Sequence, residues 1–370
     1  MTLEIEEQSL CRSSIAWSHS DEASNDFRSD YCTKPTLPML RAIINTSLGD
    51  DVTEEDATTN SFQEYVADLL GHEASLLVLS GTMGNQVSLR TALGAPPYSI
   101  LADHRGHIIH LEAGGASMLC GALIKMVVPS NGHHLTLEDV KLNSTVTESP
   151  YDCPTRVISL EIPLSGTIMP LSEVRAISQW ARAQSPPIHM HLDGARLWEA
   201  VVLGSFTLRE IGECFDSIQL CLTKGLGAPI GSVVVGNSIF IKRARWIRKV
   251  LGGGLRAAGL IAAPARVAIE DVFLGGKLKA AQEKANRASV LWEQLGGKLQ
   301  RPTETNMVWL DFDASGLTRD DFYPMMRKFN LIAMEHPLMN GRLVFHYQIT
   351  DDAFAKLCQV FRVVLKGGSD

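Results

Sequence analysis

Residues 155–193 read TRVISLEIPLSGTIMPLSEVRAISQWARAQSPPIHMHLD, and this stretch decides the fold class. It begins with a β-rich apolar run, continues with the helix-period segment LSEVRAISQWARA, and ends with a second apolar run, IHMHLD. The same alternation occurs in ASLLVLS followed by NQVSLRTAL, and in IHMHLD followed by ARLWEAVVLG. Short strands that alternate with helices indicate βαβ units. We therefore expect an α/β fold with a mostly parallel sheet covered by helices on both faces.

The length of 370 residues exceeds the usual size of a single core, which predicts a large domain and a smaller one. We expect residues 1–24 to form an N-terminal arm, residues 25–268 the large domain, and residues 269–370 a small C-terminal α+β domain. A long helical pattern, roughly Leu260 to Leu295, would lead into the small domain, where TNMVWLDFD, NLIAMEH and GRLVFHYQIT are predicted strands.

The composition is that of a soluble enzyme with a small substrate. Apolar residues make up 45%, charged residues 20%, and the net charge is -7, a balance that does not favour nucleic acid or an anionic membrane as partner. The seven cysteines form no CxxC pair, which favours reduced thiols. No apolar run reaches the length of about 18 residues that spans a membrane. The acidic, polar N-terminus resembles neither a secretory nor a transit signal, so we expect a cytoplasmic enzyme.

Lys224 is the strongest candidate for chemistry. It lies between the apolar strand SIQLCL and the small residues GLGAPIG, which precede a second apolar strand, SVVVG. Although most lysines lie on exposed turns, these neighbours predict a buried one. Burial of an ammonium group is costly, so such a lysine lowers its pKa, pairs with an anion, or is neutralised covalently as an imine.

A phosphate-binding turn is the second candidate. In VLSGTMGNQVSL, residues 78–89, a strand ends and a helix begins, so Gly81 and Thr82 would offer backbone donors and a hydroxyl at the positive end of the helix. By itself this pattern is also typical of an ordinary helix cap.

Asp193 allows two interpretations. On a strand, His189, His191 and Asp193 would point the same way, as three metal ligands do. A metal site would require further ligands at later strand ends and would leave Lys224 unexplained. A carboxylate at the carboxyl end of a strand also suits a protonated ring nitrogen. Together with a buried lysine and a phosphate turn, it predicts pyridoxal phosphate (PLP) and no metal.

Six separated motifs carry a family resemblance: NDFRSD, SGTMGNQ, HIIHLEAGG, HLDGARLW, CLTKGLGAPIGSVVVG and GGGLRAAG. Together they resemble the threonine aldolase family of fold-type I PLP-dependent enzymes, over nearly the whole chain from Asn25. The resemblance implies that Lys224 forms the Schiff base with PLP, that Asp193 binds the pyridine nitrogen, and that His107 stacks on the ring.

The resemblance also implies the remaining contacts and the assembly. Gly81 and Thr82 would hold the phosphate, together with Arg256 from a neighbouring subunit. Arg196 and Arg342 would bind the substrate carboxylate, with Ser29 nearby. A homotetramer, built as a dimer of dimers, is expected. Glu112, in HLEAGG, would either orient the cofactor region or begin a helix.

The sequence departs from the family pattern where a β-hydroxyl group would be held. Ile162, Pro163 and Leu164 replace a polar stretch whose histidine helps to hold that hydroxyl. Three further departures lie in site-forming segments: Thr53 for a common tyrosine, Tyr31 and Cys32 for threonine and valine, and Ala257 for glutamine. Loss of a general base costs retro-aldol cleavage about 10²- to 10⁴-fold.

Racemisation requires a different arrangement, with a proton donor or acceptor on each face of Cα. Lys224 would serve one face, and His107, Tyr31 or a water molecule the other, while Ile162 and Leu164 would accept the methyl group of alanine. Some fungal members of the family are alanine racemases that supply D-alanine for nonribosomal cyclic peptides, and this is our leading hypothesis. The alternative is an L-threonine or L-allo-threonine aldolase that yields glycine and acetaldehyde. Intact Lys224 and Asp193 argue against a non-catalytic relative.

Overall fold

The computed structural model describes residues 23–147 and 149–365. The predicted arm, residues 1–24, therefore falls outside the described residues except for its last two. The described chain divides into two compact units. The sheet unit comprises residues 47–222 and 230–262, and the C-terminal unit comprises residues 23–46, 223–229 and 263–365.

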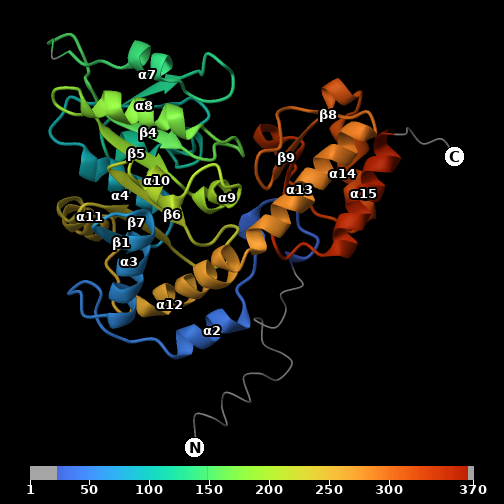
Figure 1. Ribbon diagram of the computed structural model, residues 1–370, viewed down its shortest axis with the longest axis horizontal. Helices are drawn as coiled ribbons and strands as arrows, with labels where there is room; N and C mark the ends of the chain where they lie inside the picture. Colours follow the sequence, from blue (N-terminus) through green and yellow to red (C-terminus); the bar gives the residue numbers. More distant parts are fainter. Residues whose placement is uncertain (1–22, 148, 366–370) are drawn as a thin grey trace, which may run out of the picture. The chain divides into compact units, whose positions relative to one another are not determined.

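The sheet unit contains a seven-stranded sheet in the order β1-β7-β6-β5-β4-β2-β3 (Figure 1). Its strands are β1 (Ala74–Val78), β2 (Ser99–Asp103), β3 (Leu123–Val127), β4 (Thr155–Glu161), β5 (His189–Asp193), β6 (Ser217–Cys221) and β7 (Ser232–Gly236). Strand β7 is antiparallel to both of its neighbours, and all other neighbouring strands are parallel. Six strands therefore run in one direction, and their carboxyl ends meet at the same edge. This confirms the predicted mostly parallel sheet.

Helices cover both faces of this sheet. On one face Leu76 and Val78 of β1 pack with Val87 and Ile241 in a buried cluster, and Leu77, which alternates with them, is also fully buried. The helices of the sheet unit are α3 (Ala57–Leu70), α4 (Gly81–Ala92), α5 (His107–His110), α6 (Gly115–Met118), α7 (Leu137–Asn143), α8 (Leu171–Arg182), α9 (Leu197–Val202), α10 (Leu208–Gly212) and α11 (Ser238–Val250). Helix α12 (Gly259–Ala268) begins in this unit.

The C-terminal unit combines helices with a three-stranded antiparallel sheet in the order β10-β9-β8. The strands are β8 (Lys298–Leu299), β9 (Met307–Asp311) and β10 (Arg342–Val344); the α-helices are α2 (Leu37–Ile44), α13 (Lys277–Gln294), α14 (Arg319–Lys328) and α15 (Asp351–Leu365). Shorter elements are the 3₁₀ turns η3 (Asp30–Cys32), η5 (Asp313–Ser315) and η6 (Pro337–Met339) and the π-helical turn η4 (Ile269–Leu274). The aromatic core of the C-terminal unit centres on Trp292. The ring centroids of Trp292 and Phe361 lie 4.9 Å apart in an edge-to-face arrangement, and Phe27 belongs to the same core.

Two expected elements differ from the structure. NLIAMEH is not a strand: Ile332 makes a single bridge to Asp26, and η6 begins at Pro337, which has no N–H to donate to a sheet. The helical pattern from 260 to 295 is interrupted by η4 and by Gly276, which adopts a positive φ of 75°.

The domain boundaries can be compared with the two units. The expected boundary at residue 268 lies close to the change of unit after residue 262. Residues 25–46 and 223–229, however, group with the C-terminal unit, because Phe27 packs in its core and Thr33 Oγ1 donates to the carbonyl of Lys224 (2.7 Å). The assignment of residues 25–268 and 269–370 to two domains stays a prediction.

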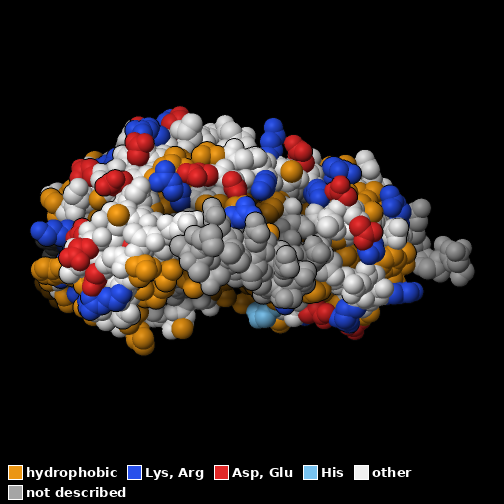
Figure 2. Space-filling model, turned by 90° about the horizontal axis from the view of Figure 1, so that it is seen from below, with side chains coloured by type: hydrophobic (Ala, Val, Ile, Leu, Met, Phe, Trp, Pro, Cys, Tyr) orange, Lys and Arg blue, Asp and Glu red, His pale blue; other side chains and the backbone are white. Residues whose placement is uncertain are grey.

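The lengths of the helices and the distribution of surface charge are relevant to membrane and nucleic-acid partners. No helix among the described residues is both long and apolar enough to cross a membrane. On the face drawn in Figure 2, described Lys and Arg side chains lie next to Asp and Glu side chains and do not form one broad basic surface.

Candidate active site

Helix α4 begins directly after β1, at the edge where the parallel strands end. The side chain of Ser80 caps it by accepting from the Met83 N–H (3.1 Å). A Cβ on Gly81 would lie 2.7 Å from Cys221 Sγ, so only glycine lets the helix start this close to β6. The N–H groups of Gly81 and Thr82 belong to the first turn, where a helix supplies no internal acceptor. The Ser80 cap therefore uses the Met83 N–H, and the N–H groups of Gly81 and Thr82 can still bind an anion.

Asp193 is the last residue of β5 and is buried. Its Oδ2 accepts from Asn85 Nδ2 (2.7 Å), and its Oδ1 accepts from the Ala195 N–H (3.1 Å). With its amide nitrogen turned toward Asp193, Gln219 also donates to Oδ1 (3.0 Å). A carboxylate with three donors is held in one orientation at the sheet edge.

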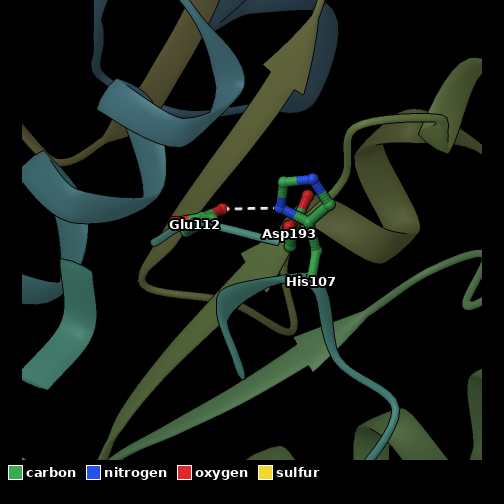
Figure 3. Close-up of side chains that lie close together, drawn as sticks. All are labelled: His107, Glu112 and Asp193. Atoms are coloured by element: carbon green, nitrogen blue, oxygen red, sulfur yellow. Dashed lines mark hydrogen bonds and ion pairs between the residues drawn. The ribbon is translucent and has the colours of Figure 1, made fainter. Parts of the chain in front are cut away.

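His107 begins α5, just after β2, and its ring is hydrogen-bonded to Glu112 (Figure 3). Its Nδ1 lies 2.8 Å from Glu112 Oε1, and its backbone N–H donates to Glu161 Oε2 (2.8 Å). Burial by itself would lower the pKa of His107, but the hydrogen bond to Glu112 and the charges of Asp193, Glu112 and Glu161 outweigh it, and the pKa is raised above 6.5. The imidazole is therefore kept with a proton on Nδ1, since an ionised carboxylate can only accept.

Glu112 does not begin a helix, because α6 starts at Gly115. Its buried carboxylate accepts from Asn85 Nδ2 (2.7 Å), Gln86 Nε2 (2.6 Å) and His107. Of the two roles left open for Glu112, the contacts favour orientation of the histidine.

His107, Glu112 and Asp193 each place one potential ligand atom within 4.8 Å of the others. The grouping could in principle hold a cation. The Asn85 amide, however, donates to both carboxylates, and His107 donates to Glu112. Each of the two carboxylates is therefore already hydrogen-bonded to a donor of the protein itself.

The two histidines of β5 make other contacts. His189 Nε2 lies 2.8 Å from Ser217 Oγ, and His191 Nδ1 lies 2.9 Å from the same oxygen. His191 Nε2 contacts Asn85 Oδ1 at 3.1 Å. Both ring nitrogens of His191 are thus engaged inside the protein, which supports a structural role over the metal hypothesis.

Three other predicted residues lie in the sheet unit. Arg196 is partly buried at the N-cap of α9, immediately after the Asp193 strand. Leu164 is buried in the turn after β4, bonded through its backbone to Thr167. Arg256 has a side chain that is 73% exposed and pairs with Asp50 of its own chain. Among the described residues, no hydrogen bond or ion pair joins Arg256 to Asp193 or His107.

Lys224, Ser29 and Arg342 belong to the C-terminal unit. Lys224 follows β6 by three residues and is partly buried, less than the sequence predicted. Arg342 is buried in β10, and its Nη2 donates to the carbonyl of Arg28 (3.1 Å), next to the fully buried Ser29. The structure thus brings Ser29 and Arg342 close to each other, while Tyr31 is 53% exposed.

Sequence reasoning missed Asn85, Gln86 and Gln219, the three buried amides around the carboxylates. Two of them stand side by side in SGTMGNQ, a motif from which only Gly81 and Thr82 received roles. The sequence signal for Asn85 and Gln86 was a pair of adjacent amides early in a helix that directly follows an apolar strand.

The sheet unit fits PLP at this edge. Asp193 is a buried, oriented acceptor for a protonated ring nitrogen, and the open N–H groups at the start of α4 suit a phosphate. A Cβ at Gly81 would fill the space where the chain approaches β6.

The fold belongs to the fold-type I class of PLP-dependent enzymes. A threonine aldolase from Leishmania major superposes with a TM-score of 0.77 at 19% identity, over 91% of this chain and 98% of that one. A structure of SPT with PLP as its internal aldimine superposes with a TM-score of 0.71 at 14% identity, over 98% of this chain and 96% of that one.

The family follows from sequence comparison. The family model described as beta-eliminating lyase matches residues 26–315. The chain is 48% identical to Aldolase vrtJ of Penicillium aethiopicum (95% of this chain, 89% of the relative) and 40% identical to Alanine racemase TOXG of Cochliobolus carbonum (95% and 90%). It is 41% identical to a low-specificity L-threonine aldolase of Eremothecium gossypii (91% and 86%). The chain is an enzyme of the beta-eliminating lyase family, and its relatives include threonine aldolases and an alanine racemase.

Proposed function

We propose that this chain is a PLP-dependent enzyme that acts at Cα of a small amino acid and interconverts L- and D-alanine. In this proposal Lys224 Nζ holds the aldehyde carbon of PLP, and Asp193 binds its ring nitrogen. His107 stacks on the ring. Gly81 and Thr82 hold the phosphate, with Arg256 of a neighbouring subunit in a homotetramer. Arg196, Arg342 and Ser29 bind the substrate carboxylate.

The observation that carries the choice of reaction is the apolar turn after β4. Ile162 is fully buried and its N–H donates to the carbonyl of Asp193 (3.1 Å), so this turn is fixed beside the end of β5. Leu164, two residues on, is also buried. Such side chains accept a methyl group, whereas a β-hydroxyl left without a partner costs about 1–3 kcal/mol.

Proton transfer at Cα is assigned to the protein's own groups. Bound PLP supplies an electron sink that stabilises negative charge at Cα. Once the substrate amine has displaced Lys224 Nζ from the aldehyde carbon of PLP, the freed amine would take or return the proton on one face. On the other face His107 is a candidate because Glu112 holds Nδ1 and leaves Nε2 to face away from the carboxylate; Tyr31 or a water molecule is the alternative.

Cleavage of L-threonine or L-allo-threonine to glycine and acetaldehyde is the second candidate. Cleavage needs a base for the β-hydroxyl proton. The hydrogen bond to Glu112 and the nearby carboxylates raise the pKa of His107, which makes its ring a stronger base. Relatives named as aldolases, including one at 48% identity, give this candidate further support. In that reaction His107 would replace the histidine that is absent after β4.

We also propose a cytoplasmic location and a role in secondary metabolism, as a supplier of D-alanine for a nonribosomal peptide. Both proposals rest on the family resemblance, and the apolar turn after β4 supports the second because it suits alanine.

The deciding experiment is proton NMR of the PLP-loaded enzyme in D₂O with L-alanine in one sample and L-threonine in another, followed by chiral analysis. Loss of the alanine α-proton signal together with D-alanine is the expected result. Glycine and acetaldehyde from threonine, with alanine left optically pure, would replace the racemase proposal by the aldolase.

A further inference from the structure

Asn85 of α4 lies at the centre of the buried polar groups. Its Nδ2 donates to Glu112 Oε1 and to Asp193 Oδ2, both at 2.7 Å, and its Oδ1 lies 3.1 Å from His191 Nε2. Both hydrogens and the oxygen of one amide are thus used, on Glu112 and on two residues of β5. The side chain is only 1% exposed, so water does not substitute for these partners.

The contacts of His191 and Ser217 match the orientation of this amide. Burial, together with the nearby His189, lowers the pKa of His191 to about 3, so its ring is neutral at physiological pH and carries one hydrogen. Because Asn85 Oδ1 can only accept, that hydrogen must be on Nε2. Nδ1 must then accept from the Ser217 hydroxyl (2.9 Å), and Ser217 Oγ in turn accepts from His189 Nε2 (2.8 Å).

Every donor in this chain of contacts therefore points toward the two carboxylates. An inverted Asn85 amide would place its oxygen against Glu112 and Asp193 and its N–H groups against a donor. The two carboxylates, which can only accept, exclude that inversion. The two carboxylates, which lie close together away from solvent, each receive a donor that cannot turn away.

We propose that Asn85 is a positioning residue, which holds Asp193 as an oriented anion for the ring nitrogen of the cofactor and holds Glu112 against His107. This inference rests on the proposed PLP function and adds to it a residue that acts through the two carboxylates. His191 and Ser217 serve the same purpose one step further from the cofactor.

The test compares Asn85→Asp, which keeps the shape of the side chain but replaces both donors by an oxygen, with Ser88→Ala. Ser88 is a matched control because it lies in the same helix and is fully buried, and its hydroxyl has no hydrogen-bond partner within the described chain. Three quantities are measured: PLP affinity of the cofactor-free protein, the pH dependence of the absorbance of bound PLP, and the urea midpoint without cofactor.

Asn85→Asp is expected to weaken PLP binding about 10- to 100-fold, as loss of a hydrogen bond to a charged group does, and to displace the pH profile of the bound chromophore. Ser88→Ala should leave both close to wild type. A folded Asn85→Asp protein with wild-type affinity and a wild-type pH profile would overturn the proposal. A purely structural role would lower the urea midpoint and leave the pH profile in place.

A second variant keeps the proposal testable if Asn85→Asp does not fold. Ser217→Ala removes the donor to His191 without touching either carboxylate, and it should shift the pH profile in the same direction by a smaller amount. An unchanged profile in folded Ser217→Ala would contradict the role of the chain of donors. Failure of the wild-type protein to bind PLP at all would overturn the proposed function itself, and so the two failures are distinguishable.

Discussion

At the scale of single residues, Lys224 gives the most direct test of the cofactor. Lys224→Ala should abolish covalent attachment of PLP, because no other amine is proposed to react with it. Borohydride reduction followed by mass spectrometry of the intact chain measures the adduct. Lys141→Ala, at an exposed lysine paired with Glu138, is the control and should retain it. A reducible adduct that survives in Lys224→Ala would show that the lysine is wrongly assigned.

His191 predicts a pH dependence of stability. Its pKa is lowered by burial to about 3 from the ordinary 6.5, so below about pH 6.5 the unfolded chain binds a proton that the folded chain does not. Proton uptake by the unfolded chain therefore lowers the free energy of unfolding as the pH falls below about 6.5, by about 1.4 kcal/mol per pH unit, and has no effect above that pH.

Urea unfolding of the cofactor-free protein at about pH 7 and about pH 5 measures this slope. His72, His189 and His346 also have pKa values lowered by burial, so wild type should lose stability steeply. His191→Gln should lose less between the two pH values, whereas His110→Gln, at an exposed position, should keep the wild-type slope. Equal slopes for His191→Gln and wild type would contradict the lowered pKa.

Residue patterns predicted part of the candidate site. The position of Asp193 at the end of its strand followed from the alternation of apolar runs with helices. The adjacent amides of SGTMGNQ were a signal for Asn85, but Gln219 had none. The role of each buried amide follows from the acceptors that surround it, and these come from segments far apart in the sequence. The exposure of Tyr31 likewise depends on packing that spacing does not encode.

At the scale of elements, the close contact between α4 and β6 sets the position of the proposed phosphate-binding turn. Gly81→Ala would place a Cβ 2.7 Å from Cys221 Sγ and 3.2 Å from the Gln219 amide, so the start of the helix must shift. We expect weaker PLP binding and a loss of about 1–3 kcal/mol in stability, as for other overpacked cores.

The double variant Gly81→Ala/Cys221→Ala tests this cause. Removal of the sulfur relieves the shorter of the two contacts, and PLP affinity should recover in part relative to Gly81→Ala alone. Fluorescence titration of the cofactor-free variants, with Cys221→Ala as reference, gives the comparison. If the double variant binds no better than Gly81→Ala, steric displacement by Cys221 is not the cause.

The elements themselves were largely predictable where apolar runs and helix periods were long. The direction of β7 was not, since an apolar strand such as SVVVG reads the same in either direction. NLIAMEH has the composition of a strand, but Pro337 and the lack of a neighbouring ladder beyond Asp26 leave it irregular. The interruption at η4 depends on Gly275, where a Cβ would lie 2.1 Å from the Asp271 carbonyl oxygen.

At the scale of the whole molecule, Arg256 predicts that a complete site needs two subunits. The family resemblance implies that it contacts the phosphate of a neighbouring subunit, and its side chain is exposed in the single chain, as such a contact requires. Lys224→Ala and Arg256→Ala should each be inactive alone and regain activity when their subunits are exchanged, because some mixed interfaces then contain both wild-type groups. Light scattering should report a tetramer. Mixed oligomers, verified by native mass spectrometry, that stay inactive would place Arg256 outside the phosphate site.

The position of β1 at the edge of the sheet has a consequence for synthesis on the ribosome. β1 pairs with β7 in a register that joins Ala74 to Gly236. The strand is therefore complete long before its partner has been translated, and Leu76, Leu77 and Val78, all fully buried in the finished protein, wait without their ladder. Among the strands of the seven-stranded sheet, β1 is the one separated furthest in sequence from its partner, so a chaperone at the ribosomal exit is expected to bind it, and substitutions in β7 should lower the yield of folded chain through aggregation of β1.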